Sequence, residues 1–404
     1  MLKLHPHSLL ALKKGHPWVT KDSFTAKFPR GELILKTEAG ILLHDPQHPH
    51  VKAHLWPNEH GQATDHLTIS TLKEQIVLRL KAAIQKRLKI NQRENRYLVF
   101  GQADLLPGLM LLQLGGHFIF QAYAFFWPRW KTELVSTLQA CIRENQLWEG
   151  EYNIYGELRQ TPPHPRQLLW GKLSRQDIIS EYGIYYHIDL TRPDFGIYTD
   201  MAAIRPQLLP FIFSSAKVLN LYAYTGAFTL YALQQRAQVT SVDLSQEYLN
   251  QLEANIKLNP QLNFSDHTPI CSSVQKALPM LLKNKQKFDL IIVDPPSASS
   301  SGQQKSSAWQ AYPQLLPLLT HLLSPHGKLV LFLNTHKISF GKFQEHLRQA
   351  IKQQKLSLTQ YPLKLTLRED CPTLPNFSEG NYLKGTVWEK GKEKMETKKQ
   401  EKEF

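Results

Sequence analysis

Apolar runs alternate with helical patterns along the second half of the chain. Four runs have the apolar composition of buried strands: residues 217–224, 239–244, 288–294 and 328–334. Two intervening segments carry apolar residues at helical spacing: 227–235 and 246–259. This alternation predicts a parallel sheet with helices on its faces, so we expect an α/β domain over residues 186–388.

The first half of the chain has a different pattern. Short β-like pieces at 31–37 and 40–45, broken by prolines, predict a small β-rich module over residues 1–70. Residues 71–96 repeat apolar positions at helical spacing and carry eight Lys or Arg against two acids. That basic helix opens a predicted small α+β domain over residues 71–185. It could be a solvated face or could lie along phosphates, and the pattern leaves both open.

Two apolar β-like runs follow the basic helix and complete the predicted α+β domain. They turn at Leu106-Pro107-Gly108 and at Gly115-Gly116. A helical segment comes next, and residues 151–158 predict one more short strand.

Composition narrows the class of protein. The 404 residues carry a net charge of +14, which fits a polyanionic partner or simply a basic surface. No apolar run approaches the length of a membrane span and the N-terminus is a poor signal peptide, so we expect a cytoplasmic protein. Three scattered cysteines, Cys141, Cys271 and Cys371, exclude a disulfide scaffold and a cysteine zinc site. No metal site is expected, and polar residues 389–404 predict a disordered tail.

The strongest local signal is the sequence Tyr222-Ala223-Tyr224-Thr225-Gly226, where an apolar strand enters a tight turn before a helix. Glycine lets the backbone approach a ligand closely, and the helix start offers free N–H groups. Asp243 closes the next predicted strand, where an acid can accept both hydroxyls of a ribose. A third glycine, which a dinucleotide pyrophosphate requires, is missing. The pattern favours a ligand with one nucleoside and no phosphate, such as S-adenosylmethionine, over an incidental glycine turn.

A second signal is Asp294-Pro295-Pro296, directly after the buried run 288–293. The carboxyl ends of parallel strands are where open α/β sheets bind ligands, and two prolines make the chain rigid there. Such an edge can hold a planar base against a methyl donor. An ordinary proline-rich loop would not explain the order of glycine turn, ribose acid and Asp-Pro-Pro.

These motifs resemble those of class I S-adenosylmethionine-dependent methyltransferases of the ribosomal RNA large subunit methyltransferase I type. The resemblance rests on residues 220–226, 241–245 and 294–297, and further on 15–19, 105–109, 196–200 with Arg205, and 379–385. It implies a PUA-like RNA-binding module, a small α+β domain and a Rossmann-like methyltransferase domain, acting on 23S ribosomal RNA. The implied S-adenosylmethionine site contains Tyr198, Asp200, Asn220, Tyr222, Thr225, Gly226, Ala227, Asp243, Leu244, Ser273 and Asp294.

One departure from the resemblance concerns the reaction. The family archetype makes 5-methylcytosine, and that chemistry needs a cysteine thiolate to attack the base first. Asn334 stands where that cysteine is expected, as in the similar large subunit methyltransferase K, which methylates a guanine ring nitrogen. The resemblance therefore implies a catalytic group of Asp294, Pro295, Pro296 and Asn334, with either cytosine C5 or a guanine ring nitrogen as acceptor. Ser273 lies where the family often has an aspartate for the adenine amine.

Other functions stay open on the sequence alone. The chain could methylate transfer RNA, a small molecule or a protein, or could be a non-catalytic RNA-binding protein of the same fold. The serine-rich residues 297–307 are consistent with a loop that closes over the target base or with simple disorder. A homodimer is also left open.

Overall fold

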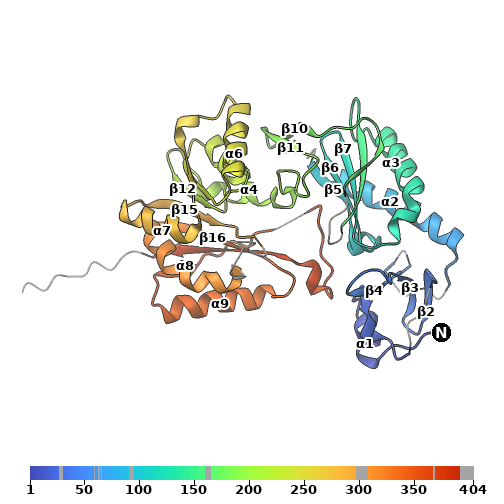
Figure 1. Ribbon diagram of the computed structural model, residues 1–404. Helices are drawn as coiled ribbons and strands as arrows, with labels where there is room; N and C mark the ends of the chain where they lie inside the picture. The colour runs from blue at the N-terminus through green and yellow to red at the C-terminus, as the bar shows by residue number, and fades with distance from the viewer. Residues whose placement is uncertain are drawn as a thin grey trace, which may run out of the picture. The chain divides into compact units, whose positions relative to one another are not determined.

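The computed structural model describes residues 1–26, 31–58, 60–61, 64, 66–90, 95–159, 165–296, 308–366 and 369–391. The chain forms two compact units (Figure 1). The first contains Met1–Ala202 and Arg368–Gly380, and the second contains Ala203–Leu367 and Asn381–Phe404. The predicted loop at 297–307 lies outside the described residues. Within the described part of the chain, every helix is too short or too polar to cross a membrane.

The first unit begins with a small β module. Helix α1 (Pro6–Lys13) precedes the antiparallel strands β1 (Trp18–Thr20), β2 (Ile34–Thr37), β3 (Gly40–His44) and β4 (Val51–Leu55), in the sheet order β1-β4-β3-β2. The predicted β pieces at 31–37 and 40–45 are confirmed. Strand β3 is buried on both faces because Leu42 packs into the module's own core while Ile41 and Leu43 pack into a larger one.

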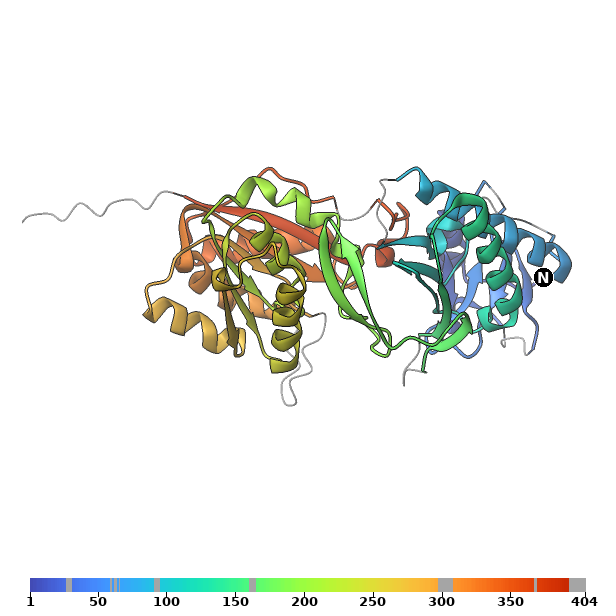
Figure 2. The ribbon, with the colours of Figure 1, turned by 90° about the horizontal axis from the view of Figure 1, so that it is seen from above.

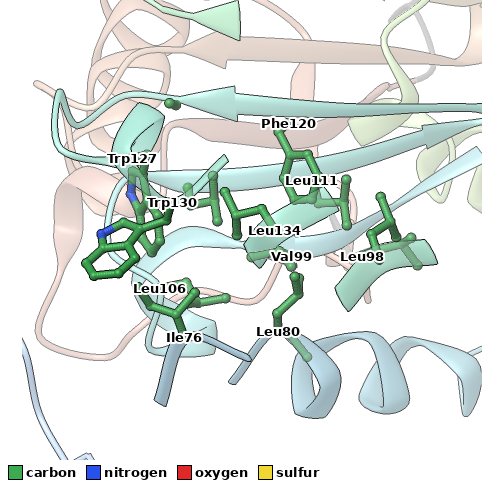
Figure 3. Close-up of a cluster of buried hydrophobic side chains, with 14 of the residues drawn as sticks. Ile76, Leu80, Leu98, Val99, Leu106, Leu111, Phe120, Trp127, Trp130 and Leu134 are labelled. Carbon is green, nitrogen blue, oxygen red and sulfur yellow. The ribbon is translucent and has the colours of Figure 1, made fainter. Parts of the chain in front are cut away.

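The larger core belongs to a five-stranded sheet with two helices on one face (Figure 2). Its strands are β5 (Asn95–Phe100), β6 (Leu109–Leu114), β7 (His117–Ala122), β8 (Asn153–Leu158) and β9 (Gln167–Trp170), in sequential order, and its helices are α2 (Ile69–Leu88) and α3 (Lys131–Asn145). Figure 3 shows Leu80 of α2 pointing toward Val99 of β5, with Ile76 beside Leu106 in the same core. A separate hairpin, β10 (Gln176–Glu181) and β11 (Ile184–Asp189), follows. The predicted turns at 106–108 and 115–116 are confirmed.

The predicted basic helix differs from the observed one in two ways. Helix α2 ends at Leu88, and Asn95 and Arg96 already belong to β5. Two arginines of α2 also face the protein interior. The Arg87 guanidinium donates to both carboxylate oxygens of Asp104, at 2.8 and 2.6 Å, and Arg79 donates to backbone carbonyls, including that of Leu105 at 2.8 Å. The guanidinium groups of these two arginines are therefore occupied by partners within the protein and do not form an exposed face for phosphates.

The second unit is a doubly wound α/β domain. Its strands are β12 (Lys217–Leu221), β13 (Gln238–Asp243), β14 (His267–Cys271), β15 (Phe288–Val293), β16 (Leu323–Asn334), β17 (Leu358–Gln360) and β18 (Leu383–Lys390). Its helices are α4 (Ile204–Gln207), α5 (Ala227–Gln234), α6 (Gln246–Leu258), α7 (Val274–Lys283), α8 (Ala308–Leu322) and α9 (Phe340–Gln353). The predicted alternation of strands and helices is confirmed.

The sheet of this unit has the order β14-β13-β12-β15-β16-β18-β17. The first five strands are parallel, and β18 is antiparallel to both of its neighbours. Helices α7, α8 and α9 cover one face, where they share a core with alternate residues of the central strands (Figure 1). The chain winds outward in opposite directions from β12 and β15. Open α/β sheets bind ligands at the carboxyl ends of the strands beside such a switch point.

Two predicted limits do not coincide with observed elements. The domain start at 186 falls inside β11, whose hairpin belongs to the first unit. The predicted tail starts at 389, yet Glu389 and Lys390 pair with Lys328 and Leu358 in the sheet. Ladder hydrogen bonds hold these two polar residues, which composition alone cannot reveal. Residues 392–404 lie outside the described part of the chain.

Candidate active site

The turn after β12 has an unusual backbone. Tyr222, Tyr224 and Gly226 have φ angles of 58°, 51° and 90°, in the left-handed region. A Cβ on Gly226 would lie 2.4 Å from Leu252 Cγ of α6, so only glycine fits without movement. Helix α5 starts at the next residue, Ala227. The predicted strand, glycine turn and helix are therefore present in that order.

Asp243 ends β13 beside this turn. Its Oδ2 accepts the backbone N–H of Tyr224 at 2.9 Å, and its Oδ1 accepts that of Ser245 at 2.9 Å. Each carboxylate oxygen has more than one lone pair, so both can also accept a hydroxyl. The structure thus brings Asp243 and the Gly226 turn together. The next residue, Leu244, is 64% exposed, and Ser273 is the residue before α7, at the end of the neighbouring strand.

Beneath the turn runs a buried chain of polar side chains that sequence reasoning missed. Asn220 Nδ2 donates to Thr229 Oγ1 at 3.0 Å, Thr229 Oγ1 lies 2.7 Å from Ser241 Oγ, and Ser241 Oγ lies 3.0 Å from His267 Nε2. Burial lowers the pKa of His267 to about 4, so the ring is neutral at pH 7. The Asn220 amide nitrogen, predicted to serve the cofactor, points instead toward α5. In the sequence, each of these residues appears only as a polar residue within a strand or helix, which does not reveal that they contact one another.

The Asp-Pro-Pro segment follows β15 and lies beside two tyrosines. Asp294 is half-buried, Pro295 is buried and Pro296 is exposed. The hydroxyl of Tyr312, a fully buried residue of α8, donates to the Phe332 carbonyl and lies 3.4 Å from the Val293 carbonyl. Burial, followed by the charges of Asp294 and Tyr222, raises the pKa of Tyr312 well above its usual value. Leu221 of β12 pairs with Val293 of β15, so Tyr222 and Asp294 follow neighbouring strands at the same level of the sheet.

Asn334 is the last residue of β16. Val293 of β15 is paired with Leu331 of β16, so Asp294 lies level with Phe332 and Asn334 extends two residues further. At about 3.3 Å per residue this places Asn334 about 7 Å beyond the level of Asp294. Because side chains alternate between faces, Asp294, Phe332 and Asn334 share one face of the sheet. Phe228 of α5 stacks on Phe332 on that face, with ring centroids 5.9 Å apart.

None of the three cysteines lies at the end of β16. Cys271 is exposed at the end of β14, four strand positions from β16 and hence about 19 Å away at the usual strand spacing. Cys141 and Cys371 are buried in the first unit. The end of β16 beside Asp294 therefore carries no thiol, because Asn334 stands there. Within the described residues, no group of three metal-binding side chains is present.

Two predicted cofactor residues belong to the other unit. Tyr198 is 52% exposed and Asp200 lies in a short 3₁₀ turn, Thr199–Met201, of the first unit. Their predicted place at the entrance of the pocket stays a prediction.

The groups at the sheet edge fit the expected cofactor. A nucleoside needs an acceptor for its ribose hydroxyls, and Asp243 is held in place by two backbone N–H groups that leave lone pairs available. A bulky sulfonium ligand also needs a close backbone approach, which the Gly226 turn provides. No phosphate-binding glycine series is present in the sequence of this turn.

Comparison with known proteins agrees with the expected cofactor. Residues 157–359 match the family model described as S-adenosylmethionine-dependent methyltransferase. The ribosomal RNA large subunit methyltransferase I of Yersinia pseudotuberculosis is 30% identical over 315 residues, covering 76% of this chain and 78% of the relative, and that of Yersinia pestis matches equally.

Solved structures share the fold. A methyltransferase in complex with SAH has a TM-score of 0.82 at 20% identity, covering 96% of this chain and 99% of that one. A SAM-dependent methyltransferase from Streptococcus mutans has a TM-score of 0.79 at the same identity and coverage. These likenesses confirm the Rossmann-like α/β fold. The family match and the curated relatives together show that this chain belongs to the S-adenosylmethionine-dependent methyltransferases.

Proposed function

We propose that this methyltransferase modifies a base of large-subunit (23S) ribosomal RNA, and that the acceptor is a guanine ring nitrogen. The observation that carries the choice of acceptor is Asn334, which occupies the end of β16 on the same sheet face as Asp294, where cysteine chemistry would need a thiol. The RNA substrate is supported by the ribosomal RNA methyltransferase activity for which the Yersinia relatives are named and by the net charge of +14.

The cofactor side of the site has clear roles for four residues. Asp243 accepts the ribose hydroxyls, and the backbone of Thr225 and Gly226 lines the methionine end together with Tyr222. Bound S-adenosylmethionine supplies an electrophilic methyl group on a sulfonium. Ala227, Leu244 and Ser273 complete the cofactor contacts in this proposal, with Tyr198 and Asp200 at the entrance and Asn220 beneath the turn.

The acceptor side follows from the chemistry of the two bases. Cytosine C5 has no lone pair and needs a covalent thiolate adduct before it can accept a methyl group. A guanine ring nitrogen already has a lone pair, so orientation and charge stabilisation suffice. Asn334 then holds the base edge by hydrogen bonds, Asp294 compensates the positive charge that develops on the base, and Pro295 and Pro296 form a rigid wall. Cytosine C5 is the second candidate, supported only by the relatives.

RNA binding in this proposal is shared among several surfaces. The four-stranded module of β1–β4 acts as a PUA-like RNA-binding module, joined to the small α+β domain. On α2, the exposed lysines Lys73 and Lys86 contribute rather than the buried arginines. We place the enzyme in the cytoplasm with its ribosomal substrate, and a homodimer remains part of the proposal.

The test combines a deletion strain with purified enzyme. Mass spectrometry of nucleosides from ribosomal RNA of the deletion strain should show loss of one methylated guanine. Purified enzyme with labelled S-adenosylmethionine should restore that methyl group on 23S RNA from the same strain. Asn334→Ala should lower kcat at least about 100-fold to a residual, measurable rate without loss of cofactor binding, whereas Cys271→Ser should remain fully active. Loss of 5-methylcytosine instead, or a cysteine-dependent reaction, would contradict the ring-nitrogen assignment.

The same experiments separate the remaining alternatives. Unchanged ribosomal RNA with altered transfer RNA or protein methylation would identify another substrate. Absence of S-adenosylmethionine binding in calorimetry would indicate a non-catalytic RNA-binding protein of this fold.

A further inference from the structure

A buried lysine fastens the end of the strand that carries Asn334. Lys384, in β18, is only 2% exposed. Its Nζ donates to the backbone carbonyl of Thr335 and to that of Tyr382, the latter at 3.2 Å. The Thr335 N–H also donates to the Tyr382 carbonyl, at 2.7 Å. One ammonium and one backbone N–H therefore join the first residue after β16 to the residue just before β18.

The register of the two strands places this junction directly after Asn334. Asn334 pairs with Leu383 and Leu333 pairs with Lys384 in the antiparallel ladder. Side chains alternate along each strand, so Lys384 lies on the face opposite Asn334. Lys384 therefore contacts the main chain from one face of the sheet, while Asp294 and Asn334 lie on the other face. The contact of Lys384 with Thr335 therefore acts on Asn334 through the backbone at residues 334–335.

The end of β16 is a position where such a contact has consequences. Asn334 is the last paired residue of its strand, and strand ends open more easily than strand centres. A buried ammonium is costly unless its donors are satisfied, and here two carbonyls accept them. Charge-assisted hydrogen bonds of this type are shorter and stronger than neutral ones. The lysine thus closes the strand end that an apolar side chain of similar length would leave to fray.

We infer that Lys384 is a positioning residue for methyl transfer: through the Thr335 and Tyr382 carbonyls it holds the Asn334 side chain at the height of the target base. This inference rests on the proposed role of Asn334. Misplacement of a base-holding group by about 1 Å costs as much as 10²-fold in rate, so loss of this contact should appear in kcat.

The same strand provides a matched control. Lys390, at the other end of β18, is 3% exposed and its Nζ donates to the Leu323 carbonyl at 3.0 Å. It lies six residues from Lys384 and hence on the same face. Leu323 begins β16, so this contact joins the strand at the end remote from Asn334. Both lysines are buried and bonded to carbonyls, but only Lys384 adjoins the candidate acceptor site.

The experiment compares Lys384→Met with Lys390→Met on 23S RNA from the deletion strain. Both variants should lose thermal stability, and both should keep the wild-type Kd for S-adenosylmethionine in calorimetry. Lys384→Met should lose about 10- to 100-fold in kcat, whereas Lys390→Met should stay within about twofold of wild type. Equal kcat values for the two variants would overturn the inference. Should the methionine variant not fold, Lys384→Gln places an uncharged NH₂ donor on a shorter stem, and the same loss is expected.

A double variant separates this inference from the function on which it rests. If Lys384 acts through Asn334, Asn334→Ala combined with Lys384→Met should have the kcat of Asn334→Ala alone. Losses that multiply would overturn the positioning role while leaving the base-holding role of Asn334 intact. Wild-type kcat in Asn334→Ala would overturn both.

Discussion

The neutral histidine beneath the cofactor turn makes the second unit sensitive to acid. His267 is 7% exposed, and its Nε2 contacts Ser241 in the polar chain that reaches Asn220. Its Nδ1 has no hydrogen-bond partner within the described structure. Burial lowers its pKa from 6.5 to about 4, so the folded unit resists protonation where the unfolded chain accepts a proton.

The size and direction of the effect follow from this difference in pKa. Between pH 6.5 and 4 the unfolded state binds more protons than the folded state. The stability of the folded unit is therefore unaffected by His267 above pH 6.5 and falls as the pH drops below it. Each pKa unit corresponds to 1.36 kcal/mol, so the total loss approaches about 3 kcal/mol below pH 4. Between pH 7 and pH 5, the histidine alone should remove about 2 kcal/mol from the free energy of unfolding.

Hydrogen exchange can isolate this contribution. Opening free energies of β12 and β13 amides would be measured at pH 7, 6 and 5 in wild type and in His267→Gln, whose amide can still bond Ser241. The variant should be less stable at pH 7, but its stability should fall less with pH, so the gap between the two proteins should narrow by about 2 kcal/mol. His44 and His48, whose pKa values burial also lowers, lie in the first unit. A gap that stays constant within about 0.5 kcal/mol would refute the reasoning.

Three further changes test the site and the first unit. Gly226→Ala should lower the free energy of unfolding by more than about 1 kcal/mol and weaken S-adenosylmethionine binding, because φ is 90° and a Cβ would lie 2.4 Å from Leu252 Cγ. Thermal melting measures the first effect and calorimetry the second. An unchanged Kd would contradict the close approach of ligand and backbone. Asp243→Asn should weaken cofactor binding about 10- to 100-fold by calorimetry, since hydrogen bonds to a charged group contribute about 1.5–3 kcal/mol. It should also lower the melting temperature, because the amide Nδ2 cannot accept one of the two backbone N–H groups that the carboxylate binds. Arg87→Met should lower the free energy of unfolding by about 3–5 kcal/mol in denaturant, because it leaves the Asp104 carboxylate buried without its cation. Lys73→Met breaks the more exposed pair with Glu133, at 2.7 Å, and should cost less than about 1 kcal/mol. Equal losses would contradict the assigned burial.

The parallel sheet and the two edge motifs were predictable because their signals are local. A buried strand needs a continuous apolar run, and a ligand-binding turn needs glycine at one position, so 288–293 and Gly226 carry their own evidence. Asp243 and Asp294 follow strands directly, and parallel strands bring their carboxyl ends to one edge. The sequence order of these residues therefore predicts that they lie along one edge of the sheet.

The supporting side chains were not predictable because their partners are distant in the chain. Thr229 and Ser241 each appear as one polar residue in an apolar element, and only the packing of α5 on the sheet joins them to Asn220 and His267. Lys384 likewise reads as an exposed charge until β18 pairs with β16. Antiparallel insertion of the last strand between β16 and β17 determines that burial.

Whether a basic side chain is buried or exposed is the property that the sequence predicts least well. A helical pattern tells which positions share a face, but a long arginine stem can lie along apolar surface while its guanidinium finds a buried acceptor. Arg87 pairs with Asp104, and Arg79 stacks 4.0 Å from the Trp56 ring centroid while bonding carbonyls. Lys384 and Lys390 are buried as well. In the proposed function, RNA binding therefore depends on exposed lysines such as Lys73 and Lys86, and its salt dependence should weaken when they are removed. Removal of the buried basic residues should lower stability instead.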